Sequence, residues 1–396
     1  MTAAGVAGRS IRAILDLNPA TEPERRVQLA WLTMLALLAM GLGACYSNPY
    51  YNPAKPHHTP EGFRNNYPHM ERQSFLKWRW QRIWEDLPPP PQDGYRFETV
   101  PVERDALRGN RSETTLTWIG HATLLLQVGG VNVLTDPQFS ERASPVSWAG
   151  PRRKVPPALR IADLPHIEAV LISHNHFDHL DLPSLRALHA QPGGPPHMFV
   201  PLGLKRFLAR EGIGSVVEQD WWEHTEHLGL RIHQVPAQHF SARTPWDRNE
   251  VLWGGFVVEH PGLRFYFAGD TGYSRDFSDI RRRLGPIDLA ALPIGAYEPR
   301  WFMRAMHINP AEAVQALQDL RAGHAVAMHW GTFEMTDEPI DEPPRALARA
   351  LADAGIPRER FFVMKHGETR RLAPLLRGRI ARGEDCTEQE RATAGC

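Results

Sequence analysis

The chain has 396 residues, 42% of them apolar, which is enough for one large globular domain or two ordinary ones. Lys plus Arg and Asp plus Glu both total 45, so net charge gives no reason to expect a nucleic acid or a strongly acidic partner. The three cysteines, Cys45, Cys386 and Cys396, suit neither a disulfide framework nor a cysteine-based zinc site, so any metal must bind to histidine and carboxylate side chains.

The first predicted element is an apolar run from Leu29 to Ala44, which two arginines precede. It is short for a membrane span, which needs about 20 apolar residues. A basic flank, a short apolar region and small residues are typical of a secretory signal peptide. Leu42–Cys45 also resembles a bacterial lipobox, which implies cleavage before Cys45 and lipid attachment to its sulfur. We therefore assign residues 1–45 to a signal and lipobox segment of an exported protein of the bacterial envelope. An uncleaved, membrane-associated anchor is the alternative.

Residues 46–113 are predicted to form a tether and an amphipathic helix. From Tyr46 to about Pro60 the sequence is rich in Tyr, Asn, Pro and His without periodicity, which indicates a tether. From Glu71 to Leu87 apolar residues recur at helical spacing, before a run of prolines. We expect this helix to pack on the following domain; a position on a lipid surface is the alternative. Its apolar face would comprise Leu76, Trp80, Ile83, Trp84 and Leu87.

From residue 114 to residue 376 short predicted strands alternate with helices, as in an α/β domain. Two of these strands flank Gly129 and Gly130, a two-residue hairpin signal. A helix is expected to start at Asn309, with Pro310 in its first turn and Glu312 three residues after the cap. The polar tail, residues 377–396, is expected to be mobile. Further strands are predicted at Ala169–Ser173, Met198–Pro201, Leu230–Pro236, Phe256–Glu259, Leu263–Ala268, Leu289–Pro293 and Ala325–Met328.

Candidate metal ligands follow the ends of several of these strands. A loop after the Ala169–Ser173 strand can direct alternate side chains at one ion and the last two at a neighbouring ion, so the spacing fits two ions. Zinc binds imidazole nitrogen and carboxylate oxygen at about 2.0–2.2 Å, and catalytic zinc sites leave room for water. Because functional groups lie on loops that a rigid sheet holds, the pattern favours a metal centre over a polar surface loop. The candidates are His174, His176, Asp178, His179, His239, Asp270 and His329.

The segments SHNHFDHLD, PAQHFSAR, FAGDT and AMHWGTF resemble the ordered motifs of the metallo-β-lactamase superfamily. The resemblance implies a four-layer α/β fold, the αββα sandwich, with two zinc ions along one edge. Asp136 would orient the histidine loop by hydrogen bonds without binding metal, and His121 is expected to be structural or supporting before it is a ligand. By the family pattern, His174, His176 and His239 would bind the first Zn²⁺ and Asp178, His179 and His329 the second, with Asp270 as the bridge.

Such a centre would favour an anionic substrate. Two zinc ions carry four positive charges, and Asp178, Asp270 and a bridging hydroxide return three if the histidines are neutral, which leaves roughly one positive charge. This charge attracts a phosphodiester more readily than a neutral amide. The nucleophile would be a metal-bound hydroxide, because zinc lowers the pKa of its water.

The stretch at residues 292–314, LPIGAYEPRWFMRAMHINPAEAV, and the later AMHWGTFEMTDEP are similar to the N-acylphosphatidylethanolamine-hydrolysing phospholipase D family. The likeness runs from about Thr114 to Thr369. It implies cleavage of a phospholipid at a membrane surface into N-acylethanolamine and phosphatidic acid. Tyr297 and His307 are candidates for phosphate contact or proton transfer, and packing of the loop is the alternative role.

Two other functions stay open. One is a lactonase or other hydrolase of a soluble ester or sugar phosphate, which would share all seven ligands. The other is a non-catalytic, exported metal-binding protein of the envelope. Manganese or iron could replace zinc, and the oligomeric state stays open. Four tryptophans could line a lipid groove, although large aromatics more often fill cores: Trp221, Trp222, Trp246 and Trp301.

Overall fold

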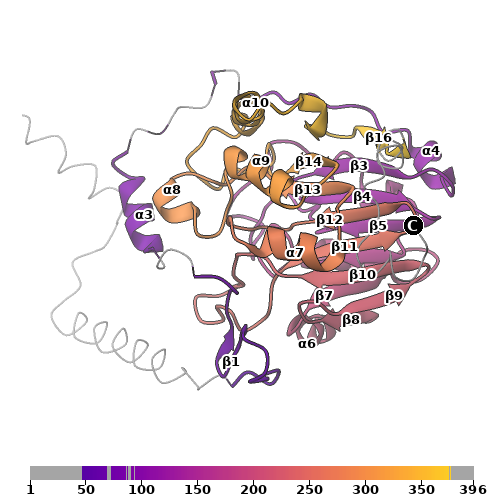
Figure 1. Ribbon diagram of the computed structural model, residues 1–396, viewed down its shortest axis with the longest axis horizontal. Helices are drawn as coiled ribbons and strands as arrows, with labels where there is room; N and C mark the ends of the chain where they lie inside the picture. The colour runs from indigo at the N-terminus through magenta and orange to yellow at the C-terminus, as the bar shows by residue number, and fades with distance from the viewer. Residues whose placement is uncertain are drawn as a thin grey trace, which may run out of the picture. The chain divides into compact units, whose positions relative to one another are not determined.

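Two seven-stranded mixed sheets form the centre of the fold (Figure 1). The computed structural model describes residues 47–68, 73–85, 87, 91–92, 94–373 and 375. The predicted signal segment with Cys45 and the predicted polar tail lie outside these residues. From Asn48 onward the described residues belong to one compact unit.

The first sheet has the order β16-β3-β4-β5-β6-β7-β8. Its strands from β5 to β8 are mutually parallel, and the others pair antiparallel. The predicted hairpin joins β4 to β5, and both of its glycines have positive φ, 59° and 79°. The strands are β3 (Thr115–Gly120), β4 (Thr123–Val128), β5 (Val131–Thr135), β6 (Ala169–Leu171), β7 (His197–Pro201), β8 (Val216–Gln219) and β16 (Thr369–Arg371).

The second sheet has the order β15-β14-β13-β12-β11-β10-β9. Strands β12 to β15 are parallel, whereas β10 and β11 pair antiparallel. Because β11 pairs antiparallel with both β10 and β12, strand β10 runs in the same direction as β12, β13 and β14. The carboxyl ends of these four strands therefore share one edge of the sheet. The strands are β9 (His224–His227), β10 (Leu230–Val235), β11 (Gly255–His260), β12 (Leu263–Phe267), β13 (Leu289–Pro293), β14 (His324–Met328) and β15 (Phe361–Phe362).

Helices cover the outer faces of both sheets and complete four layers. Apolar residues of α4, α5 and α6 share a core with the outer face of the first sheet. Residues of α7, α9 and α10 join the core of the second sheet, which also fills the space between the sheets. The strands can be apolar on both faces because both faces are covered. These helices are α4 (Arg104–Gly109), α5 (Leu182–His189), α6 (Leu204–Arg210), α7 (Asp276–Leu284), α9 (Pro310–Asp319) and α10 (Pro343–Asp353).

The predicted helix start at Asn309 is confirmed. The Asn309 side chain accepts a hydrogen bond from the Glu312 backbone N–H, and the Glu312 side chain accepts one from the Asn309 N–H, which completes a capping box. Helix α9 follows the loop that carries His307, so this cap fixes where that loop ends. The αββα fold implied by the resemblance is likewise what the structure contains.

The prediction of a tether up to Pro60 is wrong for the described residues. Strands β1 (His58–Thr59) and β2 (Gly62–Phe63) form a small antiparallel hairpin. His57, His58 and Phe63 are buried. The polar composition suggested exposure, but the two histidines contact the buried carboxylate of Asp220 at 2.7 and 2.9 Å. Long-range pairing of this kind leaves no periodic signal in the sequence.

Within the predicted span Glu71–Leu87, the described helix covers only Phe75–Gln81, and its packing face was predicted wrongly. Helix α3 spans Phe75–Gln81 and starts at Ser74, whose side chain accepts from the Lys77 N–H. Trp78 is buried and stacks on Phe302 of α8 (Arg300–Met303), with ring centroids 5.0 Å apart. The predicted apolar residues are exposed, by 77% for Leu76 and 63% for Trp80 on the helix, and by 66% for Ile83 and 72% for Trp84 in the turn that follows it. Among the described helices, none combines the length and apolar character that crossing a bilayer requires.

Candidate metal centre

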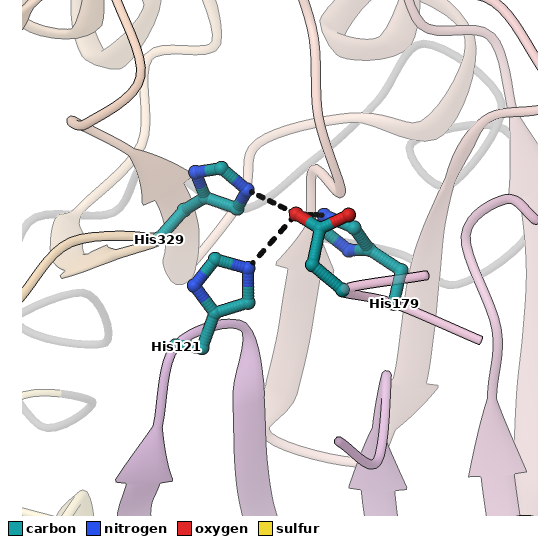
Figure 2. A group of neighbouring side chains, drawn as sticks. His121, His179 and His329 are labelled. Atoms are coloured by element: carbon teal, nitrogen blue, oxygen red, sulfur yellow. Dashed lines mark hydrogen bonds and ion pairs between the residues drawn. The ribbon is translucent and has the colours of Figure 1, made fainter. Parts of the chain in front are cut away.

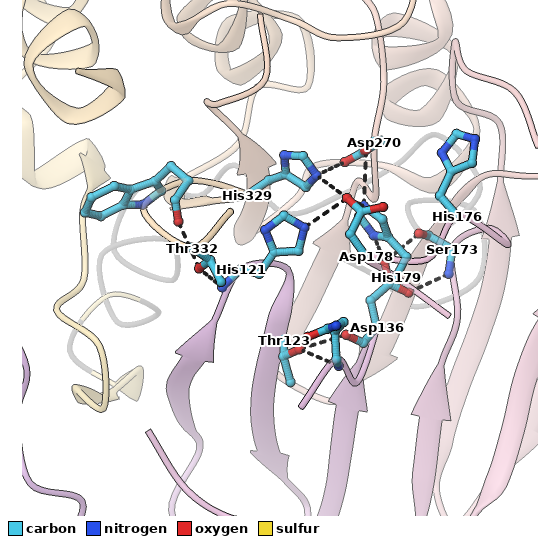
Figure 3. Close-up of polar contacts among 12 residues, drawn as sticks. His121, Thr123, Asp136, Ser173, His176, Asp178, His179, Asp270, His329 and Thr332 are labelled. Carbon is cyan, nitrogen blue, oxygen red and sulfur yellow. Dashed lines mark hydrogen bonds and ion pairs between the residues drawn. The ribbon is translucent and has the colours of Figure 1, made fainter. Parts of the chain in front are cut away.

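All seven predicted ligands lie on loops at one edge of the two sheets. Figure 3 labels His176, Asp178, His179, Asp270 and His329. His174 to His179 follow β6, His239 follows β10, Asp270 follows β12 and His329 follows β14. The side chains are buried or nearly so. Because these strands end at a common edge, residues more than 150 positions apart in sequence meet in one cluster.

Three imidazoles form the first set. The His176 Nδ1 atom lies 2.9 Å from His174 Nε2 and 3.3 Å from His239 Nε2. Ligand atoms at about 2.0–2.2 Å from a tetrahedral zinc lie roughly 3.3–3.5 Å from one another. The three nitrogens can therefore face one ion, and all three residues have ligand atoms within 4.8 Å of one another.

The second set is built around the Asp178 carboxylate. Its Oδ2 atom lies 3.2 Å from His179 Nε2 and 3.3 Å from His329 Nε2. His121 also reaches this oxygen, at 3.1 Å from its Nε2 atom. Figure 2 shows the three imidazoles around one carboxylate oxygen. His121 thus supports Asp178 by a hydrogen bond. Together with Asp178, His179 and His329 it could also bind an ion, so the geometry fits both the supporting role and the ligand role that the sequence suggested.

Asp270 lies between the two sets. Its Oδ2 atom is 3.2 Å from His179 Nε2 and 4.0 Å from His239 Nε2, and its Oδ1 atom is 3.1 Å from His329 Nε2. A carboxylate that faces ligands of both sets is placed to bridge two ions.

Hydrogen bonds on the far side of the rings fix which nitrogen faces the centre. The Asp136 Oδ2 atom lies 2.6 Å from His179 Nδ1 and accepts a 2.5 Å bond from the Ser173 hydroxyl (Figure 3). The same hydroxyl lies 2.9 Å from His174 Nδ1. Imidazole N–H groups that donate in these directions leave the Nε2 lone pairs for a metal. Asp136 therefore orients the loop as predicted.

The two buried carboxylates of the cluster, Asp178 and Asp270, require positive charge beside them. Burial raises the pKa of Asp178 and of Asp270, but the neighbouring histidines, His179 foremost, together outweigh burial and hold both pKa values well below the ordinary range. Burial lowers the pKa of His179, yet the surrounding carboxylates, Asp270 foremost, raise it well above its usual value. In the part of the chain that the structure describes, the buried His179 Nε2 and Asp270 Oδ1 make ion-pair contacts at 3.2 and 3.1 Å but no hydrogen bond of regular geometry. Bound cations would supply the positive charge that the two carboxylates otherwise draw from a protonated His179.

The two candidates on the loop between β13 and α9 have different surroundings. His307 belongs to the centre, because its Nδ1 atom lies 3.8 Å from Asp270 Oδ2 and its ring lies 5.2 Å from that of His239. Tyr297 is buried, and burial and then Glu338 and Glu342 raise the pKa of its hydroxyl. The charges that act on Tyr297 thus come mainly from carboxylates outside the metal centre.

Sequence reasoning missed Asn65. Its side-chain amide donates to the His239 carbonyl oxygen at 3.0 Å, and its amide oxygen accepts from the His239 N–H at 3.1 Å. Asn65 precedes His239 by 174 residues and lies just beyond the predicted tether. No local pattern in the sequence pointed to it.

Comparisons with known proteins agree with this geometry. Residues 131–330 match the β-lactamase superfamily domain. The chain is 42% identical over 268 residues to the N-acyl-phosphatidylethanolamine-hydrolyzing phospholipase D 1 of Caenorhabditis elegans, covering 65% of this chain and 75% of that protein. It is 32% identical over 262 residues to a metal-dependent hydrolase of Nitratidesulfovibrio vulgaris, covering 65% of this chain and 95% of that protein. The crystal structure of a possible metal-dependent hydrolase from Veillonella parvula has the same fold, with a TM-score of 0.53 and 20% identity over 66% of this chain and 100% of the other.

An αββα sandwich whose strand ends gather histidines and aspartates around a site for cations defines a metal-dependent hydrolase of the metallo-β-lactamase fold. The chain belongs to the β-lactamase superfamily, and its predicted similarity to the phospholipases D that hydrolyse N-acylphosphatidylethanolamine is confirmed. A non-catalytic metal-binding protein of the envelope no longer fits, because these relatives are hydrolases.

Proposed function

We propose that this protein cleaves N-acylphosphatidylethanolamine at a lipid surface, releasing N-acylethanolamine and phosphatidic acid, with two Zn²⁺ ions bound by the seven predicted ligands. The supporting observation is the arrangement of two ligand sets joined by Asp270, in a chain that is 42% identical to a protein named for this activity. Bound zinc ions would supply positive charge for the phosphodiester and lower the pKa of a coordinated water.

The chain's own residues set the geometry for this reaction. Asp136 and Ser173 hold the His179 and His174 rings with Nε2 directed inward. His307 borders the same space, and burial lowers its pKa to about 3. A neutral imidazole can donate one hydrogen bond to a phosphate oxygen but is a poor general acid at neutral pH, so we assign His307 to phosphate contact. Tyr297 is assigned to packing of the loop.

The solvent-facing side of α3 is the proposed contact with the lipid surface. Leu76 and Trp80 are exposed on the helix and Ile83 and Trp84 in the turn after it, and Lys77 and Arg79 give the helix the positive charge that favours anionic lipids. On its other side, Trp78 stacks on α8, which leads into the loop of His307. Loops from the metal-binding edge add two more exposed tryptophans, Trp148 and Trp246. By contrast, Trp221 is a core residue.

Lipid-product mass spectrometry tests the activity. Wild-type protein is expected to release phosphatidic acid from N-acylphosphatidylethanolamine vesicles, and elemental analysis is expected to find two zinc ions per chain. Turnover of lactones alone would replace the phospholipid assignment with the lactonase alternative. Two bound zinc ions without hydrolysis of any ester or phosphodiester would refute the assignment of the reaction.

Vesicle sedimentation tests the lipid contact with a matched pair of leucines. Leu76 lies on α3, whereas Leu228 is exposed in the turn before β10, at the opposite end of that strand from the metal ligands. Since burying a leucine in an apolar phase contributes roughly 1.5–3 kcal/mol, Leu76→Ser is expected to weaken vesicle binding about tenfold or more. Leu228→Ser is expected to leave binding unchanged. Equal effects of the two substitutions would exclude α3 as the contact.

Export and lipid attachment at Cys45 are proposed from the sequence alone. Mass spectrometry of the mature N-terminus is expected to find a lipidated Cys45. An intact Met1 without lipid would contradict this proposal.

A further inference from the structure

We propose that the N-terminal strap, defined as residues 48–67, is part of the metal centre, and that Asn65 is its positioning residue for His239. The inference deepens the proposed function, because it rests on His239 as a metal ligand. It does not depend on which substrate the enzyme cleaves.

The Asn65 side chain bonds both backbone groups of His239, the N–H and the carbonyl oxygen. Its amide N–H donates to the His239 carbonyl oxygen, and its amide oxygen accepts from the His239 N–H, at 3.0 and 3.1 Å. The same amide oxygen also accepts from the Trp253 indole N–H at 3.1 Å. Only a side chain that combines a donor and an acceptor can make these bonds together, which aspartate and leucine cannot do.

The strap continues along the neighbouring residues of the centre. The Gln238 side chain donates to the Tyr67 carbonyl oxygen at 3.5 Å, and the Asn66 side chain donates to Asp276 at 2.9 Å. The Tyr67 hydroxyl donates to Asp279, which, like Asp276, lies in the first turn of α7. Beyond Asn65, the strap is therefore fixed to a helix of the second sheet's outer layer.

The other end of the strap is anchored at a buried carboxylate. Asp220 accepts from Lys55 at 2.5 Å and lies 2.7 and 2.9 Å from the Nε2 atoms of His57 and His58. The His57 ring also stacks on Trp221, with centroids 4.4 Å apart. The two histidines and Asp220 could by geometry hold a cation. Lys55 already supplies positive charge to this carboxylate, so we interpret the cluster as an anchor.

His239 needs this support because of where it lies. The chain from residue 236 to residue 254 has no helix or strand, and among the described residues its only β-pairing is an isolated bridge between Gln238 and Gly272. On the side away from the centre, the His239 ring is held by the Met306 carbonyl oxygen, 2.9 Å from its Nδ1 atom. Ligands must stay within about 0.5 Å of their productive position, and loss of a supporting contact typically weakens metal binding 10–100-fold.

The experiment compares two asparagines of the same strap. Asn65→Ala removes the bonds to His239, whereas Asn52→Ala alters an exposed asparagine that bonds only within the strap. Zinc affinity is measured by competition with a coloured chelator, and the visible spectrum of the cobalt-loaded protein reports the coordination geometry. Asn65→Ala is expected to weaken binding of one zinc ion roughly 10–100-fold and to change the cobalt spectrum. Asn52→Ala is expected to match wild type.

A second variant, Asn65→Asp, distinguishes loss of the His239 contact from a general folding defect. It keeps the size and the acceptor of the side chain but loses the donor, so it is expected to fold and to show an intermediate affinity. Wild-type affinity and spectrum in both Asn65 variants would overturn the inference. A wild-type protein that binds zinc but cleaves no N-acylphosphatidylethanolamine would refute the proposed substrate and leave this result intact. A wild-type protein that binds no zinc would overturn both proposals.

Discussion

Asp136→Asn is the substitution that most directly tests how the second ligand set is oriented. Asp136 is fully buried; its Oδ1 atom accepts from the Ser173 N–H at 2.7 Å, and its Oδ2 atom lies 2.6 Å from His179 Nδ1. An asparagine of the same size has one oxygen and one NH₂ group. If the NH₂ group takes the Oδ1 position, it faces the Ser173 N–H, which is also a donor. If it takes the Oδ2 position, it faces the Nδ1–H of His179. His179 can then form a bond only by changing tautomer, which puts its proton on the Nε2 atom that faces the metal.

The size of the effect follows from the bond that is lost. A hydrogen bond to a charged group contributes about 1.5–3 kcal/mol, which corresponds to roughly 10–150-fold in affinity. Supporting contacts of metal ligands typically change metal affinity by about 10–100-fold, so the two estimates agree. We therefore expect Asp136→Asn to bind one zinc ion 10–100-fold more weakly, with the first ion retained.

Elemental analysis after dialysis against a buffered zinc concentration measures this loss. Asp163→Asn is the matched control, because Asp163 is also buried but pairs with Arg160 at 2.7 Å, away from the centre. Circular dichroism checks that both variants are folded. Two zinc ions bound with wild-type affinity in Asp136→Asn would refute the tautomer argument.

Three further predictions concern the bridge, the charges and the anchor. Asp270→Asn is expected to abolish phosphatidic acid release in a folded protein, as measured by lipid mass spectrometry; residual turnover near wild type would exclude the bridging role. Removing metal with a chelator is expected to lower the melting temperature, because buried carboxylates lose their counter-charge, and added zinc is expected to restore it. The pKa of Asp220 in the folded protein lies below its usual value, because its contacts with His57 and Lys55 outweigh burial. Ionised Asp220 therefore stabilises the folded state above the unfolded pKa of about 3.9, and this stabilisation is lost as pH falls through the folded value. In denaturant unfolding of the metal-free protein, the difference in free energy of unfolding between wild type and Asp220→Asn should therefore become smaller from pH 5 to pH 3. A difference that does not depend on pH would contradict this.

The parts of the fold that the sequence predicted are those with short-range signals. Adjacent glycines marked the hairpin of β4 and β5, and Asn309 with Glu312 marked the start of α9. The ligands were found because each follows an apolar strand, and parallel strands bring their carboxyl ends to one edge. Both signals need only a few consecutive residues.

The parts that escaped prediction depend on contacts between distant segments. Helical spacing over residues 71–87 placed Leu76 and Trp84 on an apolar face, yet the buried residue of α3 is Trp78, which stacks on Phe302 and donates to Asp337 at 2.9 Å. Periodicity identifies an apolar face but not the surface available to receive it. Asn65 illustrates the same limit, because an isolated asparagine gains its role only from its partner 174 residues later.

The predicted domain boundary at residue 114 separates the metal ligands from their supports. All seven ligands lie after it, but the strap bonds His239 and Gln238 from before it. Helix α3, also before it, holds Asp337 through Trp78, and the Asp337 N–H in turn donates to the Glu298 carbonyl oxygen of the loop that leads to His307. Two N-terminal elements thus fix two of the loops that surround the site. A chain cut at residue 114 would keep every ligand, yet it would lose the contacts that hold His239 and the His307 loop in place.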